Sequence, residues 1–325
     1  MPLKKKIKNL LNFLLRIGLS LGLIVFLLRK IDFRQVFSLI RTADLAYLSL
    51  AAFLFLICNT LLLLRWNLLI KGLDVHIPFS QVVRSFFIGL FFNVFLPSSA
   101  GGDVARIINI FSHTPHRARA VASVVLDRLS GFISLVLICG VSLILGYKYV
   151  NDSSIYLILA AFLFLLVGMI FVLFSRRLFS WVSRIFSKAP HIANKLTSLN
   201  DSFVFFRNRY GVIAISIIIS IVAQVVFFWA SYYIIRSFHT EVGMIYFMIF
   251  IPIITLVTSL PISMGGLGVR DASSVYFFNK VGVSSSMALG LSLMSFVFVT
   301  GVGLLGGLVY VLTLPSKRNT RSMQV

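Results

Sequence analysis

The sequence is poor in acidic side chains, in cysteine and in long polar stretches, and each shortage excludes a class of protein. Only 9 Asp and Glu residues accompany 30 Lys and Arg residues among the 325 positions. The two cysteines, Cys58 and Cys139, lie inside apolar runs, so neither a disulfide framework nor a cysteine metal site is expected. The longest polar-leaning segment, 175–210, is too short to form a soluble enzyme domain.

Motifs for nucleotides and metals are missing as well. No G-x-x-x-x-G-K-[ST] sequence occurs, which excludes a Walker A site for ATP. Gly266-Leu267-Gly268 lacks the rest of a dinucleotide fingerprint, and His113 and His116 have no further ligands nearby. We therefore expect no catalytic residue, no cofactor and no bound metal.

Apolar sequence is what the chain has in abundance. Hydrophobic residues make up 59% of it, against roughly 45–50% in soluble domains. Several runs reach the ~20 residues that span a bilayer. They predict an all-α polytopic membrane protein with eight hydrophobic segments, namely six full transmembrane helices and two broken, re-entrant pairs. The full helices are expected at Leu10–Leu28, Leu45–Leu64, Val121–Tyr147, Ile155–Phe174, Val212–Ile235 and Met287–Leu312. The broken pairs are expected at Pro78–Leu96 with Asp103–Ser112, and at Met244–Leu260 with Gly265–Lys280.

Two segments outside these spans are predicted to lie at the membrane surface. Arg29–Asp44 carries an apolar helical stripe, and segment 175–210 has apolar residues at spacings of three and four. Arg65-Trp66 follows the second run and is expected to anchor its end at the interface. The chain then divides into a first helix with an interfacial segment (1–44), a first repeat (45–150), a linking helix with a basic segment (151–210), a second repeat (211–314) and a basic tail (315–325).

The basic residues mostly flank apolar segments, where they orient membrane proteins and contact anionic headgroups. No nucleic-acid partner is therefore expected. Six crossings and a cytoplasmic N-terminus place more Lys and Arg residues on the cytoplasmic side than on the other. We expect an integral protein of the cytoplasmic (plasma) membrane with both termini in the cytoplasm.

One motif, L-P-x-S-x-G-G-x-x-x-R, occurs twice. The copies run from Leu96 to Arg106 and from Leu260 to Arg270, 164 positions apart. With the topology above, the two copies enter the membrane from opposite sides. This predicts an inverted-topology repeat, an arrangement in which transporters bind substrate near the membrane midplane.

The repeated residues suit an anion. A proline blocks the continuing helix, and the glycine pair allows a sharp turn into a new helix with unpaired N–H groups at its start. An arginine one turn later can offer a planar fork to phosphate. The alternative is a plain hairpin turn whose arginine caps carbonyls or pairs with aspartate. The predicted breaks are Pro97 and Pro261, and the predicted phosphate-binding residues are Ser99, Gly101, Gly102, Arg106, Arg128, Ser263, Gly265, Gly266 and Arg270.

Carboxylates in the same regions are expected to support those arginines. They are Asp103, Asp127 and Asp271, with Asn93 as a secondary polar residue. Because adjacent residues on a helix do not face each other, ion pairs should join different elements, for instance Arg106 with Asp127. The first copy is expected to carry more of the polar chemistry than the second.

Three stretches together resemble one family. They are F-N-x-F-L-P-x-x-A-G-G-D-x-x-R (Phe92–Arg106), D-R-L-x-G (Asp127–Gly131) and P-x-S-x-G-G-L-G-x-R-D (Pro261–Asp271). They are similar to the transmembrane, flippase-like domain of lysylphosphatidylglycerol synthases, over about Leu10 to Leu312. The resemblance implies a membrane domain that moves lipid between leaflets. The sequence contains no aminoacyl-transferase domain, so lysine transfer is not expected, and Asp271 stands where the family also has Glu.

Three functions are considered on this basis. The first is a flippase for an anionic or phosphate-bearing lipid that works without ATP and binds the headgroup between the two breaks. The second is a polyprenyl-phosphate-binding accessory protein or enzyme of lipid-linked glycan or cell-envelope synthesis, partnered by a glycosyltransferase or a lipid-modifying enzyme. The third, an ion-coupled small-solute transporter, is disfavoured because the other spans hold few polar residues.

Overall fold

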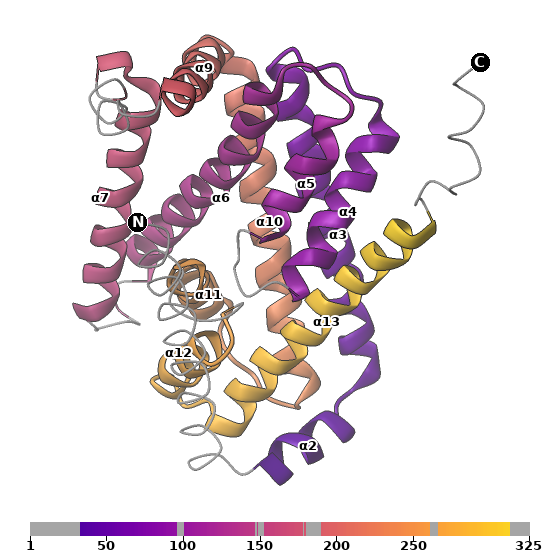
Figure 1. The fold of residues 1–325 in the computed structure, drawn as a ribbon. Helices are drawn as coiled ribbons and strands as arrows, with labels where there is room; N and C mark the ends of the chain where they lie inside the picture. The colour runs from indigo at the N-terminus through magenta and orange to yellow at the C-terminus, as the bar shows by residue number, and fades with distance from the viewer. Residues whose placement is uncertain are drawn as a thin grey trace, which may run out of the picture.

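The described part of the chain is built from helices (Figure 1). The computed structural model describes residues 33–95, 101–146, 148, 153–177, 179, 190–260 and 266–312, and no β-strand occurs among them. The helices are α2 (Phe33–Arg41), α3 (Leu45–Gly72), α4 (Phe79–Phe95), α5 (Gly101–Phe111), α6 (Arg117–Leu145), α7 (Ser153–Phe174), α9 (Pro190–Arg207), α10 (Tyr210–Ser237), α11 (Met244–Ser259), α12 (Val269–Asn279) and α13 (Ser285–Leu312).

Within the described residues, five helices are long and apolar enough to cross a membrane, namely α3, α6, α7, α10 and α13. They match five of the six predicted spans, and the sixth, Leu10–Leu28, lies outside the described residues. The apolar helices α4 and α11 have only 17 and 16 residues. At about 1.5 Å per residue they fall short of the roughly 30 Å hydrocarbon core. Each is followed by a helix of 11 residues, α5 or α12.

The helix order α3–α4–α5–α6 recurs as α10–α11–α12–α13: a long apolar helix, a short apolar helix, an 11-residue helix and another long helix. The two long helices that begin these units pack side by side and antiparallel (Figure 1). The backbone N–H of Asp44, before α3, donates to the carbonyl of Ser237 at the end of α10 (2.9 Å). Near the other end of α3, Arg65 bonds to Ser220, earlier in α10.

The remaining helices pair across the two units. Helix α4 packs on α13, and α11 packs on α6, so each unit supplies the partner of the other's short apolar helix. The α4–α13 contact is close because glycines line it. A Cβ added at Gly306 would lie 2.2 Å from the Phe87 carbonyl oxygen, too close for any larger residue without a shift of the backbone.

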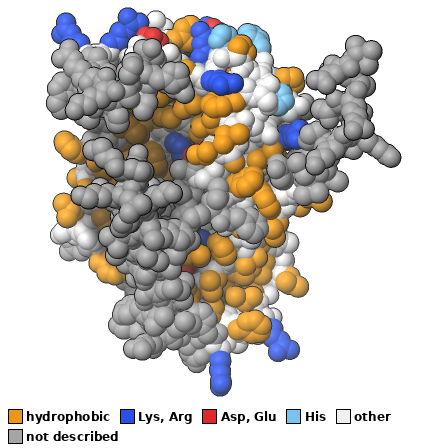
Figure 2. Space-filling view, in the orientation of Figure 1, with side chains coloured by type: hydrophobic (Ala, Val, Ile, Leu, Met, Phe, Trp, Pro, Cys, Tyr) orange, Lys and Arg blue, Asp and Glu red, His pale blue; other side chains and the backbone are white. Residues whose placement is uncertain are grey.

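Figure 2 shows apolar side chains over the middle of the visible face, with Lys and Arg side chains gathered towards the upper and lower ends. The exposed apolar residues are densest on α7, where Leu157, Phe164 and Phe171 are among the most exposed. A surface of this kind is stable in hydrocarbon but not in water. Together with the long apolar helices, it identifies an integral membrane protein.

Both segments predicted to lie at the membrane surface contain a helix. In segment 175–210 this is α9, which packs on α6 and α7 with Phe203 and Phe206 buried. Helix α2 occupies the predicted Arg29–Asp44 segment from Phe33 onward, and its Val36 is buried against Leu289 of α13. Phe37 of α2 stays 72% exposed, and the placement of both segments at a membrane surface remains a prediction.

Candidate functional site

The first candidate site begins where α4 and α5 approach each other. The N-terminal turn of a helix leaves backbone N–H groups without helical partners. The N–H of Gly102 donates to Oδ1 of Asn93 on α4 (2.9 Å), so Asn93 joins two helices. A Cβ at Gly102 would lie 2.1 Å from the Gly89 carbonyl oxygen. Only glycine therefore allows α5 to start this close to α4.

Asp127 of α6 lies at the centre of a buried ion network. Its Oδ1 accepts from Nε of Arg65 (2.8 Å) and its Oδ2 from Nη2 of Arg106 (3.0 Å). Arg65 also donates from Nη1 to the Ser220 hydroxyl of α10 (2.9 Å). The side chains of Arg65, Arg106 and Asp127 are each 7% exposed. The expected pairing of Arg106 with Asp127 is confirmed.

Asp103 extends this network towards the surface. Its Oδ1 lies 2.9 Å from Nη2 of Arg106, one turn along α5, and its Oδ2 accepts from Nε of Arg128 (2.7 Å). The Arg128 side chain is 40% exposed, whereas that of Asp103 is 16% exposed. Arg128 is therefore the member of the network that a ligand can reach first.

The network holds three arginines and two aspartates, so one positive charge is not balanced within it. Nε of Arg106 is buried and has no hydrogen-bond partner among the residues that the structure describes. The Arg106 guanidinium lies over the Trp66 ring at 4.7 Å, and the Trp66 indole N–H donates to the Ser123 hydroxyl (3.2 Å). Trp66 thus holds the Arg106 guanidinium in place. Within the described part of the chain, Nε of Arg106 remains without a hydrogen-bond acceptor near the start of α5.

Arg65 and Trp66 were missed by the sequence prediction, which placed them at the interface as an anchor. They are 5% and 0% exposed, and α3 continues past them to Gly72. Helix α3 extends further than expected because the Asp127 carboxylate, and not water, is the partner of the Arg65 guanidinium. The signal that could have found this role is Asp127, an acidic residue inside the predicted third span that can pair with more than one arginine.

The second candidate site lies at the start of α12 and is smaller. Arg270 donates from Nε to the Ser292 hydroxyl of α13 (2.8 Å), and that hydroxyl lies 2.5 Å from Oδ1 of Asp271. Asp271 accepts from the Gly268 N–H (3.0 Å) through its other oxygen and caps the helix. One arginine and one aspartate balance each other here, so the first copy carries more charge, as expected.

One pairing rule fails in the second site. Arg270 and Asp271 are adjacent, yet Nη2 of Arg270 lies 3.2 Å from Oδ1 of Asp271. The Ser292 hydroxyl contacts both side chains and draws them to the same side of α12. The expectation that pairs join different elements is therefore wrong here, as it is for the Asp103–Arg106 pair within α5.

The two sites lie in different halves of the molecule, around α5 and α12, and the hydrogen bonds described above stay within each site (Figure 1). Gly101 begins α5, and Gly266 adopts φ 78°, in the left-handed region that favours glycine. The predicted residues Pro97, Ser99, Pro261, Ser263 and Gly265 lie outside the described residues.

These buried arginines lie within a stretch that a known family covers. The model of the lysylphosphatidylglycerol synthase TM region matches residues 13–307. The chain belongs to this family. The resemblance drawn from the three motifs is thereby confirmed.

Relatives of this lysylphosphatidylglycerol synthase-type region are membrane proteins of similar length. A UPF0104 membrane protein of Pyrococcus horikoshii is 22% identical over 86% of this chain and 90% of its own length. Another, of Methanocaldococcus jannaschii, is 24% identical over 90% of this chain and 93% of its own length. A third, of Methanothermobacter thermautotrophicus, is 22% identical over 81% of this chain and 85% of its own length.

Proposed function

We propose that the protein moves an anionic, phosphate-bearing lipid between the leaflets of the cytoplasmic membrane without ATP. The headgroup phosphate binds at the first arginine network and passes between the two helix breaks. Membership in a family named for the TM region of a lipid-modifying synthase supports a lipid substrate. The alternative function, binding of a polyprenyl phosphate, uses the same contacts to phosphate. The assay below distinguishes the two lipids.

The observation that carries the proposal is the unbalanced charge of the first network. A buried cation in a membrane protein is costly and generally marks a pathway or a binding site. Here Arg106 has an unpartnered buried Nε, and Arg128 is half-exposed. A phosphate that replaces Asp103 on Arg128 would balance the surplus charge through a charge-assisted hydrogen bond.

An inverted repeat provides a route for movement. The units α3–α6 and α10–α13 share helix order, and their first helices are antiparallel, which supports the proposal that the two breaks open to opposite sides of the membrane. Helices α4 with α5, and α11 with α12, then form the two re-entrant pairs. Alternating access follows if one unit rocks against the other.

The test is a lipid-scrambling assay in liposomes with fluorescent phosphatidylglycerol or polyprenyl phosphate. Arg128→Gln removes a charged hydrogen-bond donor, which is worth roughly 1.5–3 kcal/mol, so transport should slow at least about tenfold. Arg106→Lys keeps the charge but loses the planar fork, and it should slow transport as well. The substrate is the lipid that the wild type transports and that these variants transport more slowly.

The matched control is Arg209→Gln. The Arg209 side chain is 45% exposed and pairs with Asp74, much as Arg128 pairs with Asp103, but it lies outside the network. Its transport rate should equal that of the wild type. Wild-type rates for Arg128→Gln and Arg106→Lys in correctly inserted protein would refute the mechanism.

A further inference from the structure

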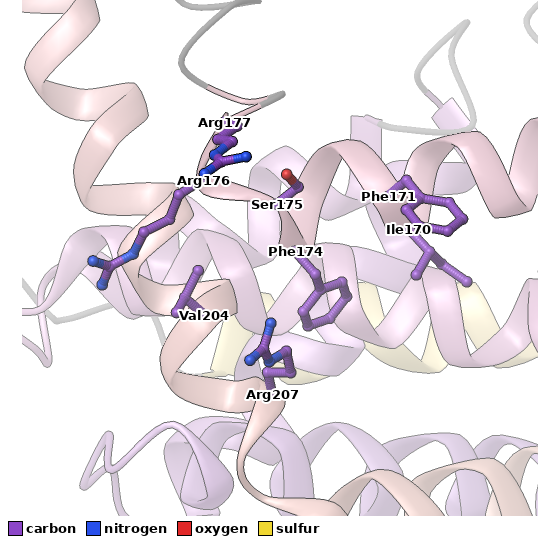
Figure 3. Close-up of a pocket in the computed structure, with 8 residues that line it drawn as sticks. All are labelled: Ile170, Phe171, Phe174, Ser175, Arg176, Arg177, Val204 and Arg207. Atoms are coloured by element: carbon purple, nitrogen blue, oxygen red, sulfur yellow. The ribbon is translucent and has the colours of Figure 1, made fainter.

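A second basic site lies far from the first network along the chain, where the C-terminal end of α7 meets α9. A pocket of about 620 Å³ opens there (Figure 3). Arg176 and Arg177 follow α7, Arg207 lies in the last turn of α9, and Phe171 and Phe174 supply apolar walls. The pocket thus combines three guanidinium groups with aromatic surface.

The walls of this pocket are fixed to each other. The Asn200 side chain of α9 donates from Nδ2 to the Leu173 carbonyl in the last turn of α7 (2.8 Å). The rings of Phe174 and Phe203 lie 6.0 Å apart between centroids, with Phe203 fully buried. A hydrogen bond and an aromatic contact therefore hold α9 against α7, and the pocket does not depend on a ligand for its shape.

Among the residues that the structure describes, Asp201 is the carboxylate that pairs with an arginine of this pocket. It lies 3.7 Å from Arg176, and the two side chains are 59% and 72% exposed. This carboxylate offsets at most one of the three guanidinium charges. Figure 3 shows Arg207 beside Phe174, Arg177 near the end of α7, and the Arg176 side chain extending across α9. The pocket therefore carries a surplus of positive charge that favours an anion.

An apolar face continues from the pocket along α7. Ile155 and Leu166 are the buried residues of this helix, whereas Phe164, Val167 and Phe171 are exposed. A soluble phosphate makes no favourable contact with such an apolar face, whereas the acyl chain of a lipid packs against it. The charge at the end of α7 and the apolar face below it match the two parts of one phospholipid.

We propose that this pocket binds the phosphate of an anionic phospholipid, whose acyl chains lie along the exposed face of α7. The bound lipid is a resident of the leaflet beside α9, and the site is separate from the transport site proposed above. Each guanidinium near an anionic surface adds about a kilocalorie per mole of attraction, so the three together should tighten binding on the order of 100-fold.

The test is native mass spectrometry of the full-length chain in detergent, titrated with phosphatidylglycerol, phosphatidylcholine or glycerol phosphate. The triple variant Arg176→Gln/Arg177→Gln/Arg207→Gln should bind phosphatidylglycerol about 100-fold more weakly at one site. Phosphatidylcholine and glycerol phosphate should bind the wild type far less well than phosphatidylglycerol. Tight glycerol phosphate binding would overturn the assignment to a lipid, and equal phosphatidylglycerol binding by triple variant and wild type would overturn the site.

Three controls separate charge, folding and the transport site. Arg34→Gln/Arg41→Gln/Lys280→Gln removes three cations at the ends of other helices and should leave the tight site intact. Asp201→Asn removes the opposing carboxylate and should strengthen binding, a gain that misfolding cannot produce. Arg128→Gln should slow transport while this site still binds, so the two proposals fail independently. Unchanged or weaker binding by Asp201→Asn would contradict the charge argument.

Discussion

At the residue scale, Asp127 has the largest structural role of any ionisable side chain described here. Two arginines from different helices, Arg65 and Arg106, each donate a hydrogen bond to one of its two oxygens, and all three side chains are buried. Taking charges out of water is costly, and mutual pairing offsets the cost only while every partner is present. The network thus stabilises the junction of α3, α5 and α6 and also makes it sensitive to single substitutions.

Asp127→Asn should lower the free energy of unfolding by about 3–5 kcal/mol, because buried Arg65 loses its counter-charge and buried Arg106 keeps only Asp103. Unfolding in mixed detergent micelles, followed by tryptophan fluorescence, measures the loss. Asp74→Asn is the matched control, since it breaks a half-exposed pair with Arg209 and should cost less than about 1 kcal/mol. Equal losses in the two variants would show that the buried network has no special role in stability.

Gly102→Ala tests the close approach of α4 and α5. The new Cβ would lie 2.1 Å from the Gly89 carbonyl oxygen, so α5 must move and the Asn93 bond to Gly102 must lengthen. We expect a destabilisation of about 1–3 kcal/mol, as for overpacked cores. Gly168→Ala on α7 adds the same methyl group where nothing lies within 4 Å, and its melting temperature should not fall. A stable Gly102→Ala protein would contradict the described crossing.

At the element scale, apolar runs predicted the long helices because about twenty such residues have few stable alternatives to a membrane helix. The sequence failed where a charge interrupts a helix. Arg65 looked like the end of a span, but its counter-charge lies 62 positions later on α6. A single sequence does not display a contact of that length, and neither could it display the Ser292 contact that draws Arg270 and Asp271 together.

Helix α9 shows the same limit for apolar contacts. The spacing of its apolar residues predicted a helix correctly, but periodicity does not tell which helices the apolar side contacts. Phe203 and Phe206 are buried where α9 packs on α6 and α7. This packing brings Arg207 of α9 close to Arg176 and Arg177 at the end of α7, and it forms a pocket that the sequence did not predict.

At the scale of the whole molecule, the proposed inverted repeat predicts that equivalent helix ends face opposite compartments. Ser112 follows α5, and Asn279 ends α12, and both are exposed. Ser112→Cys and Asn279→Cys should therefore react with an impermeant maleimide from opposite sides of oriented vesicles. The native cysteines, 7% and 0% exposed, should give little background. Labelling of both new cysteines from the same side would exclude the inverted arrangement.

The bond from Arg65 to Ser220 joins α3 of the first unit to α10 of the second, while the same guanidinium binds Asp127 within the first. A half-chain ending before α10 would leave one donor of a buried arginine without its acceptor. Although the sequence reads as two similar halves, the folded units share a side chain at their boundary. The two units therefore depend on each other for the burial of this arginine.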